Sequence, residues 1–497
     1  MEKLGRKIVR FRIPIFIIGL LLLIPSVFGY INTRVNYDVL YYLPDSIETM
    51  QGQDILVDEF GTGAYSMFIC EGMENKDVAK LKEQIEDVEH VSKVVWYDSF
   101  ADISIPMEML PEDIREAFNA DDSTLMFIIF DTTTSADETM DAIENIRALA
   151  GKQCFLSGMS AIVTDTKNLA ESEVAIYVLI AVVLSCIVLA LTMESYLIPV
   201  FFLLSIGMAI LYNMGTNIFM GQISYITKAL SAVLQLGVTM DYSIFLWHSY
   251  QEQREKGEED HKEAMATIKS VVGSSITTIA GFIALCFMSF TLGLDLGIVM
   301  TKGVVFGVIC CVTVLPSMIM IFDNALEKTK HRQLIPDFPK ISDFVVKHHV
   351  IFAILFVVLF IPFAYFQAHA SVYYNLDASL PDTLPSVQAN TKLSEEYDMG
   401  AAHMILLDKD LDAKQKYNMI ADIEKVDGVK QVLGLESIIG PAFPESMIPE
   451  DVKEILESDN YELMLIMNEY AVASDEVNSQ LSEINTILKQ YDPTGML

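Results

Sequence analysis

The sequence predicts an α-helical multi-pass membrane bundle that carries two extracytoplasmic α+β domains and contains an internal repeat. Three observations support this fold class. Seven apolar segments are long enough to cross a hydrocarbon core of about 30 Å. The acidic residues gather in two other segments of the 497-residue chain. Motifs of the first half recur in the second half at an offset of about 337 residues, which indicates a repeat.

The seven apolar segments share the length and the scarcity of charge that a membrane-spanning helix needs. They are residues 13–31, 174–192, 197–217, 223–249, 267–289, 294–322 and 344–366. The first one follows MEKLGRKIVRFR and continues into GYINTRVNYD without a small-residue cleavage site. We therefore expect it to remain in the protein as an anchor rather than to act as a removable signal peptide.

The distribution of charge separates the solvated segments from the membrane segments. Residues 38–171 contain 28 acidic against 8 basic residues, and residues 366–497 contain 24 against 8. This strong acidic excess keeps both domains soluble and argues against a nucleic-acid partner. Lys and Arg gather instead at the N-terminus and in the 323–347 loop, and such clusters face the cytoplasm. The acidic domains are therefore expected outside the cytoplasmic membrane.

The repeat predicts the fold of the acidic domains. VNYDVLYYLPDS at 35–46 reappears as VYYNLDASLPDT at 372–383, and LMFII at 125–129 reappears as LMLIM at 463–467. Apolar strands and charged helices alternate in each copy in the order βαββαβ, which predicts a split βαβ, or ferredoxin-like, sandwich. The second copy ends where five further spans would follow by analogy with the first. We therefore interpret the sequence as a C-terminally truncated chain.

These segments define the expected domain organisation. The boundaries are 1–34 for a cytoplasmic N-terminus and the first transmembrane helix, 35–172 for the first extracytoplasmic domain, 173–323 for a five-helix transmembrane unit, 324–343 for a cytoplasmic linker, 344–366 for the seventh transmembrane helix, and 367–497 for the second extracytoplasmic domain, incomplete at its end.

Two cysteines of the first acidic domain form a candidate disulfide. Cys70 ends the first predicted strand and Cys154 begins the last one, and the ferredoxin-like topology makes these strands antiparallel neighbours. The second copy has Leu407 in place of Cys70, so a bridge is not intrinsic to the fold. The remaining four cysteines lie in predicted spans, where small soft side chains commonly pack.

The stretch GVTMDYSIFLWHSY, residues 237–250, places a carboxylate inside an apolar span. A charge at that depth costs about 2.5–3.5 kcal/mol, so Asp241 is a candidate proton carrier, with Tyr242 beside it. Hydroxyl groups of the next span fall at a similar depth, since a helix rises about 1.5 Å per residue. They belong to Ser274, Ser275, Thr277 and Thr278. The alternative is a structural aspartate that these hydroxyls satisfy permanently.

The arrangement of one span, an outer βαββαβ domain and five clustered spans, with Asp-Tyr on the fourth span, resembles the resistance-nodulation-division (RND) superfamily. The compact outer domains and LGVTMDYSIFLWHSYQEQREKG at 236–257 resemble its MMPL branch of hydrophobe and lipid exporters. The resemblance implies a non-enzymatic, proton-driven exporter of hydrophobic or lipid-like substrates, without a cofactor. It also implies that Asp241 and Tyr242 form a proton relay with a matching pair on a tenth span, which this sequence lacks.

Two alternatives remain open at this point. The predicted spans two to six also resemble a sterol-sensing domain, which would fit a non-transporting lipid receptor or scaffold. A protein-export accessory of the same superfamily is the other alternative. The sequence contains no G-x-x-x-x-G-K-[ST], G-x-S-x-G or H-E-x-x-H motif and no Cys/His cluster, so an ATP-driven pump, a hydrolase and a metal site lack support. The expected partners are protons, membrane lipids and the substrate, and a homo-oligomer stays open.

Three charged residues, Lys228, Asp295 and Lys302, lie toward the outer ends of predicted spans. Long amines near helix ends usually extend to the membrane interface, whereas a pairing of either lysine with Asp295 is the alternative.

Overall fold

The computed structural model describes residues 7–8, 10–99, 112–255, 260–331, 339–370, 379–439 and 450–497. It divides into two compact units. The first unit combines Met1–Tyr42 with Ala170–Tyr373, and the second combines Leu43–Leu169 with Tyr374–Leu497. Parts of the predicted linker 324–343 and of the repeat motif at 372–383 lie outside the described residues.

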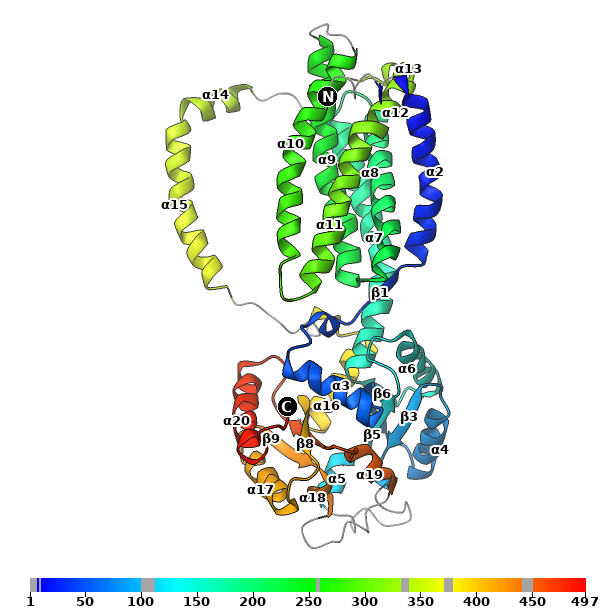
Figure 1. Cartoon of the computed structure of the whole chain (residues 1–497), viewed down its shortest axis with the longest axis vertical. Coiled ribbons are helices and arrows are strands. Elements are labelled where there is room, and N and C mark those ends of the chain that lie inside the picture. Colours follow the sequence, from blue (N-terminus) through cyan, green and yellow to red (C-terminus); the bar gives the residue numbers. More distant parts are fainter. Residues whose placement is uncertain are drawn as a thin grey trace. The chain divides into compact units, whose positions relative to one another are not determined.

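The first unit is a bundle of long apolar helices (Figure 1). Its helices are α2 (Arg12–Ile31), α7 (Met159–Thr192), α8 (Leu197–Gly215), α9 (Tyr225–Glu255), α10 (Asp260–Leu285), α11 (Leu292–Ile309), α12 (Leu315–Ile321), α13 (Asp323–Lys328), α14 (Pro339–Lys347) and α15 (His349–Ala368). Helices α8, α9 and α11 pack on one another, α10 packs on α9 and α11, and α2 packs on α8. The two short strands β1 (Arg34–Asn36) and β7 (Gln222–Ser224) pair in parallel at one end of this bundle.

Six helices within the described ranges are long and apolar enough to cross a membrane. They are Arg12–Ile31, Met159–Thr192, Leu197–Met220, Tyr225–His248, Leu292–Ile321 and His349–Ala368. The predicted span 267–289 overlaps α10, and Val271–Leu285 is an apolar stretch of that helix among the described residues.

Two helices also differ from their expected form. Helix α7 starts at Met159, before the expected 174, because the polar stretch ahead of the span contains no proline or glycine that would end a helix. Its residues therefore belong to both units. The span 292–321 contains a π-helical segment, Cys310–Val314, between α11 and α12. Such single-turn irregularities have no simple sequence signature.

Helix α11 packs closely between its neighbours because it carries glycines on two faces. An added Cβ at Gly297 would lie 2.8 Å from the Phe282 carbonyl oxygen on α10, and one at Gly307 would lie 2.6 Å from Thr239 Oγ1 on α9. Small residues spaced four apart let membrane helices approach closely. The pairs Gly293–Gly297 and Gly303–Gly307 have this spacing, and together they hold α11 against α10 and α9.

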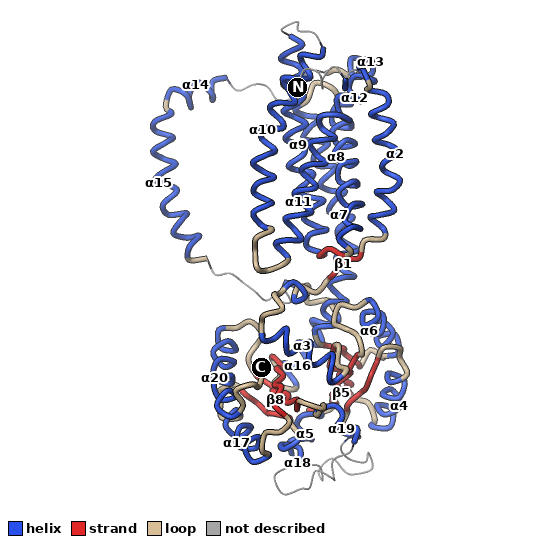
Figure 2. Tube along the Cα trace, in the orientation of Figure 1, coloured by secondary structure: helices blue, strands red, loops and turns tan. Residues whose placement is uncertain are grey.

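The second unit contains two β-sheets covered by helices (Figure 2). The first sheet has the strand order β3-β5-β2-β6, with antiparallel neighbours. The second has the order β8-β10-β9, also antiparallel. The strands are β2 (Ala64–Glu71), β3 (Val91–Val95), β5 (Ser123–Phe130), β6 (Cys154–Ser157), β8 (Ala401–Asp408), β9 (Val429–Leu433) and β10 (Tyr461–Asn468).

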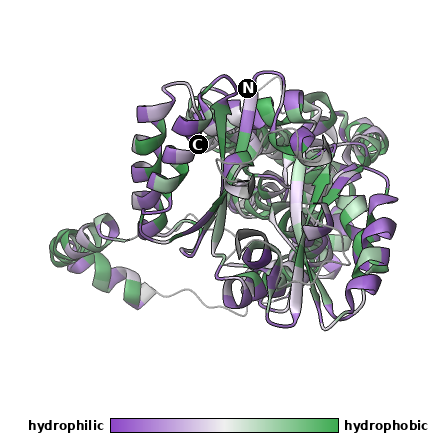
Figure 3. Cartoon of the chain, turned by 90° about the horizontal axis from the view of Figure 1, so that it is seen from below, coloured by the Kyte–Doolittle hydropathy of each residue, from purple (hydrophilic) through white to green (hydrophobic). Residues whose placement is uncertain are grey.

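The helices of this unit bury one apolar face. They are α3 (Glu48–Phe60), α4 (Asn75–Glu86), α5 (Glu112–Phe118), α6 (Asp137–Leu149), α16 (Pro385–Glu396), α17 (Ala413–Ile423), α18 (Leu435–Ile439), α19 (Glu450–Leu456) and α20 (Asp475–Tyr491). Val78 and Ile85 of α4 and Ile143 of α6 are fully buried in the core of the first sheet. Figure 3 shows hydrophilic residues on the outward faces of the helices at the rim, as expected for a solvated unit.

Each sheet of the second unit is contacted by a helix from the other half of the chain. Helix α16 packs on β6 of the first sheet, and Leu393 and Tyr397 belong to that sheet's core. Ser123 Oγ on β5 donates to Tyr397 Oη over 3.0 Å. Helix α3, from the first half of the chain, contacts the second sheet: its Glu59 carboxylate accepts hydrogen bonds from Ser458 and Asn460, next to β10. Each sheet is therefore completed by a helix from the other half of the chain.

Candidate functional site in the helical unit

Asp241 and Tyr242 lie in the middle of α9 but face different surroundings. Tyr242 is 7% exposed, packs in the bundle core and donates from its hydroxyl to Thr278 Oγ1 on α10 over 3.2 Å. Asp241 is exposed at the surface of the bundle. Within the described ranges, its carboxylate has no hydrogen-bond or ion-pair partner. Neighbouring residues of an α-helix point about 100° apart, so one residue can face α10 while the other faces away.

The four predicted supporting hydroxyls do not converge on Asp241. Thr278 contacts Tyr242, as described above. The other three donate to carbonyl oxygens of α10 itself: Ser274 to Val271 over 3.1 Å, Ser275 to Val272 over 3.0 Å, and Thr277 to Ser274 over 2.8 Å. None of these hydroxyls has a hydrogen bond to the Asp241 carboxylate among the described residues, and their supporting role stays a prediction. Equal depth along two helices does not determine which faces of the helices meet.

A row of buried polar side chains on α9 was not singled out from the sequence. Its members recur every four residues and are at most 1% exposed: Thr227, Ser231, Gln235, Thr239 and Ser243. Gln235 accepts from Asn213 Nδ2 on α8 over 3.1 Å and donates to the Gly303 carbonyl on α11 over 3.0 Å. The regular spacing was the available signal, because residues four apart share a helix face.

This polar row ends at a buried carboxylate near the start of α9. Asp295 is 6% exposed and accepts from the Ser224 amide over 2.8 Å and from Thr227 Oγ1 over 2.6 Å. The N-terminus of a helix favours a negative charge, which explains the position of this carboxylate. Lys302 donates to Asn217 Oδ1 over 2.6 Å. Asp295 and Lys302 are therefore anchored inside the bundle, rather than extended to the interface.

The two cysteines of the candidate disulfide lie opposite each other in the second unit. Cys70 on β2 is paired in register with Cys154 on β6, and their Sγ atoms are 3.8 Å apart. Both are free thiols in this structure. The hydrogen bond with Cys154 and burial raise the pKa of the Cys70 thiol. The disulfide stays a prediction that thiol counting with and without reductant can test.

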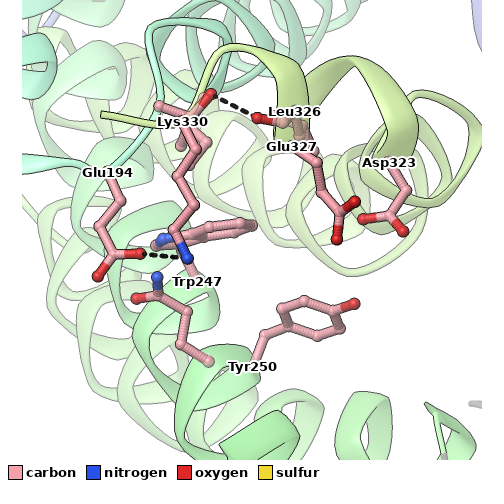
Figure 4. Close-up of a pocket in the computed structure, with 10 residues that line it drawn as sticks. Glu194, Trp247, Tyr250, Asp323, Leu326, Glu327 and Lys330 are labelled. Atoms are coloured by element: carbon pink, nitrogen blue, oxygen red, sulfur yellow. Dashed lines mark hydrogen bonds and ion pairs between the residues drawn. The ribbon is translucent and has the colours of Figure 1, made fainter. Parts of the chain in front are cut away.

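A polar cavity of about 340 Å³ lies at the opposite end of α9 from Asp295 (Figure 4). Trp247 and Tyr250 of α9 form one wall, and Figure 4 shows the carboxylates of Asp323 and Glu327 pointing toward Tyr250. The Lys330 ammonium pairs with Glu194 over 3.4 Å. The cavity thus lies between α9 and the helix ends around it. In the part of the chain that the structure describes, no group of three His, Cys, Asp or Glu side chains could hold a metal ion.

The model of the MMPL family matches residues 73–352, which is more than half of the chain. The chain belongs to the MMPL family. The matched region runs from the first sheet through α11 and α12, and it includes the Asp241–Tyr242 pair and its contact on α10. This MMPL chain is therefore a multi-pass membrane protein.

Three curated relatives agree with this assignment. A Methanocaldococcus jannaschii chain, described as a membrane protein, is 24% identical over 62% of this chain and 90% of its own length. The apo-petrobactin exporter of Bacillus anthracis is 22% identical over 90% of this chain and 65% of its own length. A Mycobacterium tuberculosis chain named as a transport protein, MmpL12, is 22% identical over 64% of this chain and 29% of its own length. Family and names support a membrane transporter of the RND/MMPL type.

Proposed function

We propose that this MMPL chain is part of a proton-driven secondary transporter that exports hydrophobic or lipid-like substrates across the cytoplasmic membrane. The observation that carries the proposal is the exposed Asp241 carboxylate in the middle of an apolar helix. A charge at that depth costs about 2.5–3.5 kcal/mol, and binding a proton removes the charge. A carboxylate that gains this much from protonation is suited to carry protons.

Tyr242 has a different role in this proposal. Its hydroxyl is held by Thr278 on α10, so it links the relay helix to its neighbour and sets the rotation of α9 about its axis. That rotation directs Asp241 away from the bundle core. Polar side chains in membrane helices usually face protein or water rather than lipid. We therefore expect the Asp241 face of α9 to meet further helices that contribute the second half of the relay.

We further propose that the two sheets are copies of one ferredoxin-like domain and that both lie outside the cytoplasmic membrane. The strands β3-β5-β2 and β9-β10-β8 have the same order, and the first sheet adds β6 beside β2. In the first sheet, β2, α4, β3, β5, α6 and β6 follow the order βαββαβ, with α5 and the short strand β4 (Asn119–Ala120) inserted between β3 and β5. The acidic excess of both segments and the basic clusters at the other membrane face support the orientation.

The direct test is Asp241→Asn in the full-length protein, reconstituted in vesicles with an imposed pH gradient. We expect gradient-driven efflux of a lipid-like substrate to fall to the level seen without a gradient, at an unchanged amount of folded protein. Asp343→Asn is the matched control, because Asp343 is an exposed aspartate on α14, and this variant should leave efflux unchanged. Undiminished efflux by Asp241→Asn would refute the relay, and lipid binding without any flux would favour the receptor alternative.

A further inference from the structure

Three sulfur atoms lie close together at the edge of the first sheet in the second unit. The Cys154 Sγ atom on β6 is 3.8 Å from Cys70 Sγ on β2 and 3.7 Å from Met73 Sδ. Strand β6 is the last strand in the order β3-β5-β2-β6, so Cys154 lies on an edge strand. We call Cys70, Met73 and Cys154 the sulfur cluster.

The backbone of the sheet brings these three side chains together. Cys70 and Cys154 are directly opposite each other in the antiparallel pairing of β2 with β6, and such residues point to the same face of a sheet. Gly72 follows the end of β2 with a φ of +58°, a conformation that glycine adopts without a steric cost. Met73 comes directly after this turn and contacts Cys154. Strand pairing and one turn therefore position the three sulfur atoms.

The sulfur cluster is accessible to solvent on one side. Cys70 is 1% exposed and belongs to the core of the first sheet, whereas Cys154 and Met73 are partly exposed. An ion can therefore approach past Cys154 and Met73 and bind against the buried Cys70. The surrounding segment, residues 38–171, has a strong excess of acidic residues, and such an excess attracts cations.

Filling the core of the sheet does not require these sulfur atoms. The second sheet has Leu407 at the position of β8 that corresponds to Cys70 of β2, and Leu407 is fully buried. An aliphatic side chain thus fills the equivalent core position. Two thiols and a thioether in contact offer something that apolar packing leaves unused, namely soft donor atoms for a metal ion.

The type and the spacing of the donor atoms indicate which ion fits. Thiolate and thioether sulfur atoms select Cu(I), whereas Zn²⁺ in proteins takes four ligands from thiolate, imidazole and carboxylate groups. A metal–sulfur bond of about 2.3 Å places the sulfur atoms of a three-coordinate site about 4.0 Å apart. The separations in the sulfur cluster, 3.7 Å and 3.8 Å, are close to this value. Small movements of the side chains therefore allow the three atoms to bind one ion.

We propose that the sulfur cluster binds a soft monovalent metal ion, Cu(I), through Cys70 Sγ, Cys154 Sγ and Met73 Sδ. The two thiols release their protons to water when the ion binds, because the thiolate is the metal ligand. The bound ion joins the end of β2 to the start of β6. This site is independent of proton transport, because it contains no residue of α9.

The test measures Cu(I) binding to the purified full chain in detergent under anaerobic conditions. Cu(I) is supplied as its bicinchoninate complex, whose colour is lost when the protein takes the ion, and X-ray absorption reports the atoms around the copper. We expect the wild-type chain to take up one equivalent, with only sulfur atoms bound to the copper. Zn²⁺ at the same concentration should not displace it. No uptake, copper bound by nitrogen or oxygen, or displacement by Zn²⁺ would overturn the proposal.

Variants locate the ion in the sulfur cluster. Cys154→Ser should abolish tight uptake, and Met73→Leu, which nearly conserves the side-chain volume, should weaken it about tenfold, or by about 1.4 kcal/mol. The matched controls are Cys186→Ser and Met159→Leu, which replace sulfur-containing residues of α7 and should bind Cu(I) as the wild type does. Unchanged binding in both cluster variants, or an equal loss in the controls, would contradict the site.

A disulfide between Cys70 and Cys154 is the competing state of the same two thiols. It would leave no thiolate to bind a metal ion. Thiol counting by maleimide labelling of the unfolded chain, isolated anaerobically without added reductant, distinguishes the two states. We expect both Cys70 and Cys154 to be labelled. A disulfide in that sample would overturn the proposal, even if the reduced protein binds Cu(I).

Discussion

Two adjacent residues of α9, Asp241 and Tyr242, differ in exposure and in hydrogen bonding. Asp241 and Tyr242 are adjacent, yet one is exposed and the other is packed against α10. The tyrosine gains a hydrogen-bond partner and apolar contacts, whereas the carboxylate gains neither within the described residues. The proposed division of roles follows from this geometry, with the proton carried by Asp241 and the helix orientation fixed by Tyr242.

A second residue-scale feature is a buried charge cluster in the second unit. The Lys416 ammonium hydrogen-bonds the Glu462 carboxylate and lies 3.9 Å from Glu436 Oε1. One oxygen atom of each glutamate is buried without a hydrogen-bond partner among the described residues. One ammonium thus serves two carboxylates. Burial and the negative charge of Glu462 raise the pKa of Glu436 to about 8.

This cluster predicts a pH-dependent stability. A glutamate has a pKa near 4.5 when unfolded, so between pH 4.5 and 8 the unfolded chain releases a proton that folded Glu436 retains. The contribution of Glu436 to the free energy of unfolding is therefore fully present below pH 4.5 and is lost as the pH rises through 8. We expect Glu436→Gln to raise the melting temperature at pH 8 relative to wild type, with a smaller difference at pH 5.

Thermal unfolding of the full chain in detergent at both pH values measures this effect. The exposed Glu395→Gln variant is the control and should follow the wild-type pH dependence. An equal change of melting temperature at pH 5 and pH 8 in Glu436→Gln would argue against the shifted pKa.

At the scale of elements, the packing of α11 fixes the position of α9, which carries Asp241 and Tyr242. Gly307 faces Thr239, which lies two residues before Asp241 on α9. Alanine normally stabilises an exposed helix position relative to glycine by about 1 kcal/mol. At Gly307 the new methyl group would lie 2.6 Å from Thr239 Oγ1, on a β-branched side chain that has little freedom to move.

We therefore expect Gly307→Ala to lower the melting temperature, because overpacking of a well-filled contact costs about 1–3 kcal/mol. Gly237→Ala on α9 is the matched control, since its added Cβ would meet no atom within 4 Å. Differential scanning fluorimetry of both variants in detergent compares them directly. A Gly307→Ala protein as stable as Gly237→Ala would show that α9 and α11 are not closely packed there.

The apolar segments and the strand patterns of the elements were largely predictable from the sequence. Short apolar runs predicted strands such as β2 and β5, and apolar length predicted spans such as α2 and α8. The early start of α7 and the π-helical segment were not predictable, because propensity does not determine where a helix begins or ends. At the candidate site, the sequence predicted that Asp241 lies within a long helix. It could not predict which side of the helix points to the bundle core, because that depends on how the helices pack.

At the scale of the whole molecule, the chain forms two units that both depend on segments distant in sequence. Helix α16 completes the first sheet and α3 contacts the second, so neither half of the second unit is independent. Sequence patterns could not predict this exchange, because each helix carries an apolar face that would fit either sheet. The MMPL family assignment supports transport, and helices from each half of the chain contact the sheet of the other half.

The central claim is that Asp241 binds and releases a proton, and infrared difference spectroscopy tests it most directly. Spectra of the full-length protein in lipid are recorded between acid and alkaline pH, for wild type and for Asp241→Asn. The account predicts a protonated-carboxyl band in the wild-type difference spectrum that is missing from the variant. Identical difference spectra of the two proteins across the whole pH range would contradict it.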